Sequence, residues 1–201
     1  MAIKVANNQS LSAITALPAA VSGGAMTLLE TQTASSSSTI SFTSNIDSTY
    51  DEYVFKFYDI HPENDNVEFS FQANASGGSG YNETVTSTMF YSYHDEGDGS
   101  QGIGYSTSGD QAQGTSFIKL GMSLGNDNDQ SLSGQLQLFG LSSTTFVKHF
   151  ISRCNYAHPS NYTEEDYKAG YFNLTSAIDE IQFKMSSGDI DSGVIKLYGV
   201  S

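Results

Sequence analysis

The chain has 201 residues, enough for one domain with a sizeable core, and carries a formal net charge of −14 from 22 acidic and only 8 basic residues. Binding to nucleic acid depends on lysine and arginine that neutralise phosphates, and this chain has no basic patch. Its negative charge also disfavours anionic membranes. We therefore expect neither nucleic acid nor a membrane among its partners.

The first 25 residues lack the alternation of a strand and end in the small residues SGGA. We interpret residues 1–25 as an extended docking arm that contacts the main domain or another subunit; the alternative is a frayed tail. A cleaved signal peptide is not favoured, because Pro18 interrupts the apolar run. The apolar side chains that would dock are Ile3, Val5, Leu11, Ile14 and Leu17.

Strand patterns begin at Met26, and we expect residues 26–201 to form one β domain. EYVFKFYDI and VEFSFQA alternate apolar and polar residues with a period of two, as half-buried strands do. The first run places Tyr53, Phe55 and Phe57 on one face and Ile60 on the other. The segment HPENDN between the runs holds turn-forming residues, and we predict that it closes a hairpin.

The remaining chain repeats this pattern to its end. Further strands are predicted in TVTSTMFYSYH, SFIKLGMSL, SLSGQLQLFG, TFVKHFISRC, AGYFNLT, IDEIQFKM and GVIKLYGV. No stretch of ten or more residues has the apolar spacing of a helix. About ten short strands without a helix predict an all-β fold, an antiparallel β-sandwich of the jelly-roll type.

The motifs of common enzymes and metal sites are missing. The four histidines lie far apart, without the spacing of a zinc site. Two acidic segments, residues 94–102 and 125–131, are predicted to be solvated turns; a structural calcium ion is the alternative, on a weak signal. Cys154 lies on a predicted strand and is expected in or near the core. We expect no cofactor, no metal and no catalysis, although paired carboxylates for glycoside hydrolysis can arise from any two acids.

Tyrosines concentrate in NYAHPSNYTEEDYKAGY, between residues 155 and 171. We predict loops for much of this segment, in which Tyr156, Tyr162 and Tyr167 are exposed. Loop tyrosines can stack on sugars or contact a partner subunit. The alternative is that they pack on the surface of their own domain.

Four segments, MAIKVANNQSLSAITALPAAVSGG, TLLETQTASSSSTISFTSNIDSTYDEYVFKFYDIHPENDNVEFSFQ, GSGYNETVTST and AIDEIQFKMSSGDIDSGVIKLYGV, resemble small virion structural proteins of tailed phages, in particular those of marine phages and cyanophages. The resemblance covers nearly the whole chain and includes no active site. It implies a non-enzymatic structural protein displayed on the virion, after assembly in the host cytoplasm. It also implies a homo-oligomer, with a trimer favoured.

Two roles in the particle are open. The first is a head decoration or cement protein that docks on the major capsid protein through residues 1–25. The alternative is a tail fibre or receptor-binding protein whose loops contact host-surface glycans. The short chain without a coiled coil or repetitive shaft favours the first, and the tyrosine-rich segment favours the second.

Overall fold

The computed structural model describes residues 26–200 and contains thirteen strands and no helix within that range. The predicted docking arm, with Ile3, Val5, Leu11, Ile14 and Leu17, lies outside the described residues. No helix able to cross a membrane occurs in this part of the chain.

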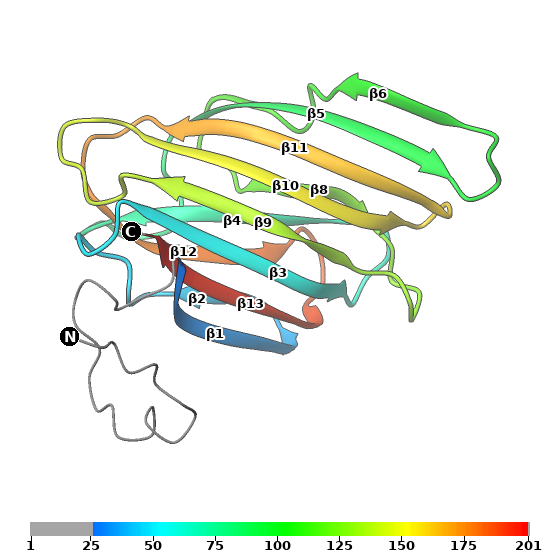
Figure 1. The fold of residues 1–201 in the computed structure, drawn as a ribbon, viewed down its shortest axis with the longest axis horizontal. Helices are drawn as coiled ribbons and strands as arrows, with labels where there is room; N and C mark the ends of the chain where they lie inside the picture. Colours follow the sequence, from blue (N-terminus) through cyan, green and yellow to red (C-terminus); the bar gives the residue numbers. More distant parts are fainter. Residues whose placement is uncertain (1–25, 201) are drawn as a thin grey trace, which may run out of the picture.

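The strands form two antiparallel sheets (Figure 1). The larger sheet contains, in spatial order, β1 (Met26–Ser37), β13 (Ile190–Val200), β3 (Glu52–Pro62), β9 (Leu132–Phe139), β10 (Lys148–His158), β11 (Tyr162–Phe172), β5 (Val85–Asp95) and β6 (Gln101–Tyr105), with β7 (Gln111–Gly114) also paired to β5. The smaller sheet contains β2 (Ile40–Phe42), β12 (Ile178–Met185), β4 (Val67–Ala75) and β8 (Ile118–Leu124). The predicted all-β sandwich is therefore confirmed, with nine strands in one layer and four in the other.

The core lies between the layers and is dominated by phenylalanine. Phe183 of β12 contacts the rings of Phe55 and Phe57 in the opposite sheet, at centroid distances of 5.1 and 5.4 Å. Edge-to-face pairs of this kind contribute on the order of 1 kcal/mol each beyond the burial of their area. These contacts hold the two sheets in register.

The predicted hairpin between β3 and β4 is wrong, although the segment between them does turn. β3 pairs with β13 and β9, whereas β4 pairs with β12 and β8 in the other sheet. Residues 63–66 therefore carry the chain from one layer to the other. Both strands have an aromatic face that requires burial, and the two faces meet across the core, where Phe57 and Phe69 lie 5.3 Å apart.

The predicted orientation of Ile60 is also wrong. Asp59 has a φ of 50°, and the pairing of β3 with β9 shifts register between Phe57 and Ile60. A bulge of this kind inserts an extra residue and reverses the alternation that follows it. Ile60 consequently points into the core, where it is fully buried.

Candidate functional site: a tyrosine cleft

The larger sheet extends beyond the smaller one, and this leaves part of its inner face uncovered. In Figure 1, β5 and β6 lie above β10 and β8, the last strand of the smaller sheet. A cleft of about 490 Å³ opens there, which we call the tyrosine cleft. Its lining residues are Tyr91, Tyr93, Asp95, Ser100, Ser106, Met122, Ser123, His158, Ser160, Tyr162 and Glu164.

Two tyrosines of β5 line one wall of the tyrosine cleft. The rings of Tyr91 and Tyr93 have centroids 6.4 Å apart and planes inclined by 25°. They lie against Gly104 and Gly102 of the neighbouring strand β6, and a Cβ at either glycine would come within 2.9 Å of a ring atom or phenol oxygen. The glycines therefore provide the space that these rings occupy.

Two further rings continue this row from the turn between β10 and β11. The rings of Tyr93 and Tyr162 lie 5.6 Å apart, and Tyr162 stacks on His158 with centroids 3.9 Å apart and planes inclined by 17°. Burial lowers the pKa of His158, so its ring is predominantly neutral near pH 7. Four neighbouring rings thus form a continuous surface along the cleft.

Carboxyl groups lie beside these rings on β11. Glu164 lines the cleft and lies opposite Tyr93, and Asp166 lies opposite Tyr91. Asp166 is only 1% exposed, and neither of its carboxyl oxygens has a hydrogen-bond donor among the described residues. Burial and then the charge of Glu164 raise the pKa of Asp166 to about 8. Asp166 is therefore mostly protonated at pH 7, and burial raises the pKa of the neighbouring Glu164 as well.

A second depression, which we call the acidic hollow, adjoins the cleft at Tyr162 and Asp95. It encloses about 400 Å³, and Glu96 and Asp129 contribute further carboxylates to its lining. No lysine or arginine of residues 26–200 lines either the cleft or the hollow. The two depressions together offer aromatic rings, hydroxyl groups and carboxylates.

The predicted loop tyrosines lie in three different environments. Tyr156 is on β10, is 1% exposed, and accepts a hydrogen bond from the backbone N–H of Met122 at 3.3 Å. The prediction that it is an exposed loop residue is therefore wrong. Tyr162 lies in the tyrosine cleft. Tyr167 lies on the opposite face of β11, where it stacks on Phe90 at 4.7 Å and donates a hydrogen bond to Glu165.

The prediction of loops failed here because β11 begins at Tyr162 and is paired on both sides. After Tyr162, its next inward side chains are Glu164, Asp166 and Lys168, all of them buried. Charged residues at buried positions conceal the apolar alternation on which strand prediction depends. The segment therefore alternates with a period of two, as a strand does, but carries charged instead of apolar side chains at its inward positions.

Tyr91, Tyr93, His158 and Glu164 were not predicted as site residues. Tyr91 and Tyr93 lie within the predicted strand TVTSTMFYSYH, where they alternate with the period of two that buried residues share. A usable signal was present, because YSY in β5 is followed across a short turn by GIG in β6. Large rings facing glycines on a neighbouring strand indicate rings that lie along the sheet instead of packing into a core.

The histidines and acidic side chains of the described residues do not form a metal site. Among residues 26–200, no three histidine, cysteine, aspartate or glutamate side chains converge as metal ligands. The ring of His61 contacts the carbonyl oxygen of Gln130 through Nδ1 at 2.7 Å, and His94 lies 3.2 Å from Asp98. The histidines therefore have local partners in separate parts of the fold.

The protein is thus an antiparallel β-sandwich with an aromatic and acidic cleft on the part of its larger sheet that extends past the smaller one. Comparisons with known protein families, curated proteins and solved structures find no match for the chain. The resemblance to phage virion proteins therefore stays a prediction.

Proposed function

We propose that this protein is a non-enzymatic glycan-binding component of a phage virion, displayed on the particle surface, as in a receptor-binding or tail-associated protein. The observation that carries the proposal is the row of rings formed by Tyr91, Tyr93 and Tyr162 along an open cleft. The virion context is based on the sequence resemblance, and the proposed glycan ligand is based on the chemistry of the cleft.

The chemistry of the cleft suits a carbohydrate. A pyranose ring presents a face of C–H groups that packs against an aromatic ring, while its hydroxyl groups require hydrogen-bond acceptors and donors at the edge. The tyrosine rings supply the packing surface, and Glu164, Asp95 and several serines supply polar partners. Asp166 is only 1% exposed and does not itself contact a ligand in the cleft.

The test is binding of oligosaccharides to the purified full-length chain, by glycan array followed by calorimetry. We expect Tyr93→Ala and Tyr162→Ala to weaken binding at least tenfold without a change of fold. Tyr105→Ala is the matched control, because Tyr105 lies on the neighbouring strand β6 and its side chain is 55% exposed on the other face of the sheet. Equal loss of binding in all three variants, or no binding to any glycan, would contradict the proposal.

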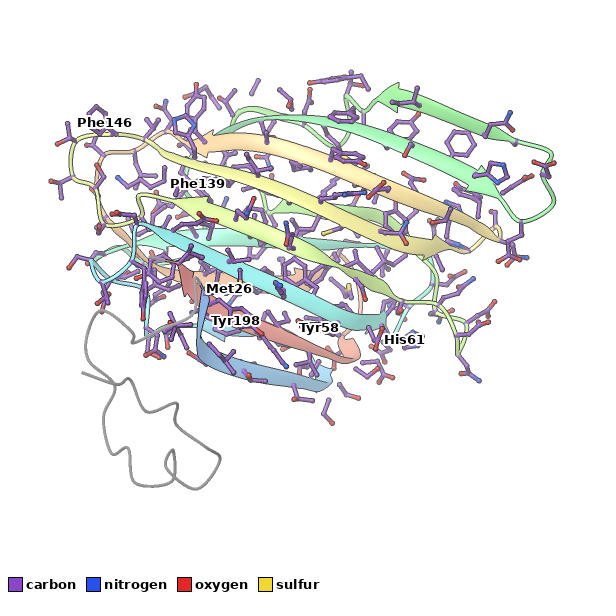
Figure 2. All side chains as sticks on the ribbon, viewed as in Figure 1. Met26, Tyr58, His61, Phe139, Phe146 and Tyr198 are labelled. Atoms are coloured by element: carbon purple, nitrogen blue, oxygen red, sulfur yellow. The ribbon has the colours of Figure 1, made fainter. Side chains whose placement is uncertain are left out.

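A head decoration protein is the second candidate, and a different surface favours it. The outer face of the larger sheet contains an apolar hollow of about 470 Å³ that Phe139, Ile151 and Ala169 help to line. At the same end of the molecule, Phe146 projects from the loop between β9 and β10 and is 73% exposed (Figure 2). Exposed apolar groups of this kind suit docking on a major capsid protein, together with residues 1–25.

Copy number in purified particles distinguishes the two candidates. Hundreds of copies per particle, counted by mass spectrometry against the major capsid protein, support a decoration protein. A dozen to a few dozen copies support a tail or vertex position and hence the glycan-binding role. Deletion of residues 1–25 should release a decoration protein from the particle, whereas Tyr162→Ala should impair adsorption of a receptor-binding protein and leave assembly intact.

A further inference from the structure

The charges around the tyrosine cleft restrict the ligand it can accept. Asp95, Glu96, Asp129 and Glu164 line the cleft and the acidic hollow, and no lysine or arginine of the described chain lines either. Carboxylates grouped in a depression raise the local concentration of cations and repel anions. Sialylated, uronic or phosphorylated glycans would therefore meet repulsion without a compensating ion pair.

Lys168 and Arg153, on the strands β11 and β10, are directed elsewhere. Lys168 is buried and donates a hydrogen bond to the carbonyl oxygen of Gly109 at 2.5 Å. Arg153 pairs with Glu165 on the outer face of the sheet and lies over the ring of Tyr167 at 5.3 Å. Neither side chain forms an ion pair with Glu164 or Asp95. The carboxylates that line the cleft can therefore pair with a cationic group of a ligand.

The position of Glu164 indicates where in the cleft a cation would bind. Glu164 lies between Tyr93 of β5 and Tyr156 of β10, and it is 9% exposed, at the wall of the cleft. An ammonium group placed in the cleft beside Glu164 would therefore also meet the faces of tyrosine rings, which attract cations within about 6 Å of their centroids.

On these grounds we propose that the cleft binds a glycan that contains a free amino group, that is, a deacetylated amino sugar, with its ammonium group between Glu164 and the ring of Tyr93. This inference rests on the proposed glycan-binding function and specifies its ligand class. Sugar rings would stack along Tyr91 and Tyr162 while the amine forms the charged contact.

The test compares a trimer of glucosamine with the matching trimer of N-acetylglucosamine by calorimetry at pH 6, using the full-length protein. We expect the amine to bind at least tenfold more tightly, and we expect this preference to shrink as salt rises. Glu164→Gln should abolish the preference while stacking on the tyrosines remains. Tyr105→Ala should retain both affinity and preference.

The possible failures are distinguishable. Equal or tighter binding of the N-acetylated trimer would overturn the free-amine inference and leave glycan binding intact. Absence of binding to both trimers and to every neutral glycan on the array would overturn the proposed function as well. If Glu164→Gln fails to fold, as judged by circular dichroism, Asp95→Asn serves in its place, with a weaker preference expected; an unchanged preference in that variant would also count against the inference.

Discussion

The ring of Tyr91 lies against the backbone of Gly104 on the adjacent strand, so that a Cβ at position 104 would come within 2.9 Å of the phenol oxygen. Tyr93 and Gly102 repeat this relationship two residues away. Between the two glycines, Ile103 faces the other side of the sheet and is 77% exposed. β6 thus combines a smooth inner surface for the tyrosine rings with an apolar outer surface.

Gly104→Ala should displace the ring of Tyr91 and weaken glycan binding about tenfold, with little effect on the free energy of unfolding. The added methyl group meets the hydroxyl end of a partly exposed side chain, which can rotate away at low cost. Calorimetry and thermal unfolding check both parts. Gly97→Ala in the same β5–β6 hairpin is the control, since its Cβ would approach other atoms no closer than 4.0 Å. Undiminished binding in Gly104→Ala would show that the glycine does not position the ring.

Asp166 should make the protein less stable as pH rises from about 4 to 8. Its pKa is raised to about 8 from 3.8, so over this range the folded state binds more protons than the unfolded state, and stability falls with pH. Asp166→Asn, which mimics the protonated acid, should reduce this slope, and the part that remains comes from Glu164, whose pKa burial also raises. Urea unfolding at pH 5, 6.5 and 8 measures it.

The control for this experiment is Glu165→Gln. Hydrogen bonding from Arg153 lowers the pKa of Glu165, so this side chain is ionised throughout the pH range and should leave the slope unchanged. Lys168, with a pKa lowered to about 8, contributes the opposite slope, which sets in as the pH approaches 8. An undiminished slope in Asp166→Asn would refute the assignment.

Lys148 should stabilise the loop between β9 and β10. It is fully buried, and its ammonium group donates to the carbonyl oxygens of Ser143 at 2.5 Å and Phe146 at 3.0 Å. Lys148→Ala leaves these acceptors unpaired and creates a cavity, at a cost of about 2–4 kcal/mol in the free energy of unfolding. Lys148→Met retains the packing of the stem and should cost less. If the two variants had the same free energy of unfolding in urea, the packing of the Lys148 stem would not contribute to the stability of this loop.

Gly193 should be among the least replaceable glycines of the sandwich. It has a φ of +128°, and an added Cβ would lie 2.8 Å from Asp59 O and Ile60 Cα at the bulge in β3. Gly193→Ala therefore combines backbone strain with a clash and should cost about 2–5 kcal/mol. Gly140→Ala shares the positive φ but meets no atom within 4 Å, and it should cost only about 1–2 kcal/mol. A smaller loss at Gly193 than at Gly140, in the same unfolding assay, would contradict this account.

The fold class was predictable because most strands obey local alternation. Leu132, Leu136 and Leu138 follow it in β9, and all three are buried in the core. Local pattern says nothing about which sheet a strand joins, since that depends on contacts between distant residues. For this reason HPENDN was correctly identified as a turn, but its two strands were wrongly paired with each other.

The candidate site was less predictable, for two physical reasons. Tyr91 and Tyr93 continue the alternation of core residues in β5, and only the extent of the smaller sheet leaves them uncovered. Glu164 and Asp166 are charged residues at inward positions, which a rule based on hydrophobicity assigns to a loop. Of the predicted tyrosines, only Tyr162 lies in the cleft, because residues at odd and even positions of β11 face opposite sides of the sheet.

The single cysteine, Cys154, is fully buried on β10, between β9 and β11 of the same sheet, and burial raises the pKa of its thiol. A reagent that requires a thiolate therefore cannot modify it while the two layers remain closed. The rate of its labelling in native buffer would measure how often the sandwich opens, without any mutation. The chain thus contains its own reporter of local opening, on the strand next to Asp166 and directly across from it.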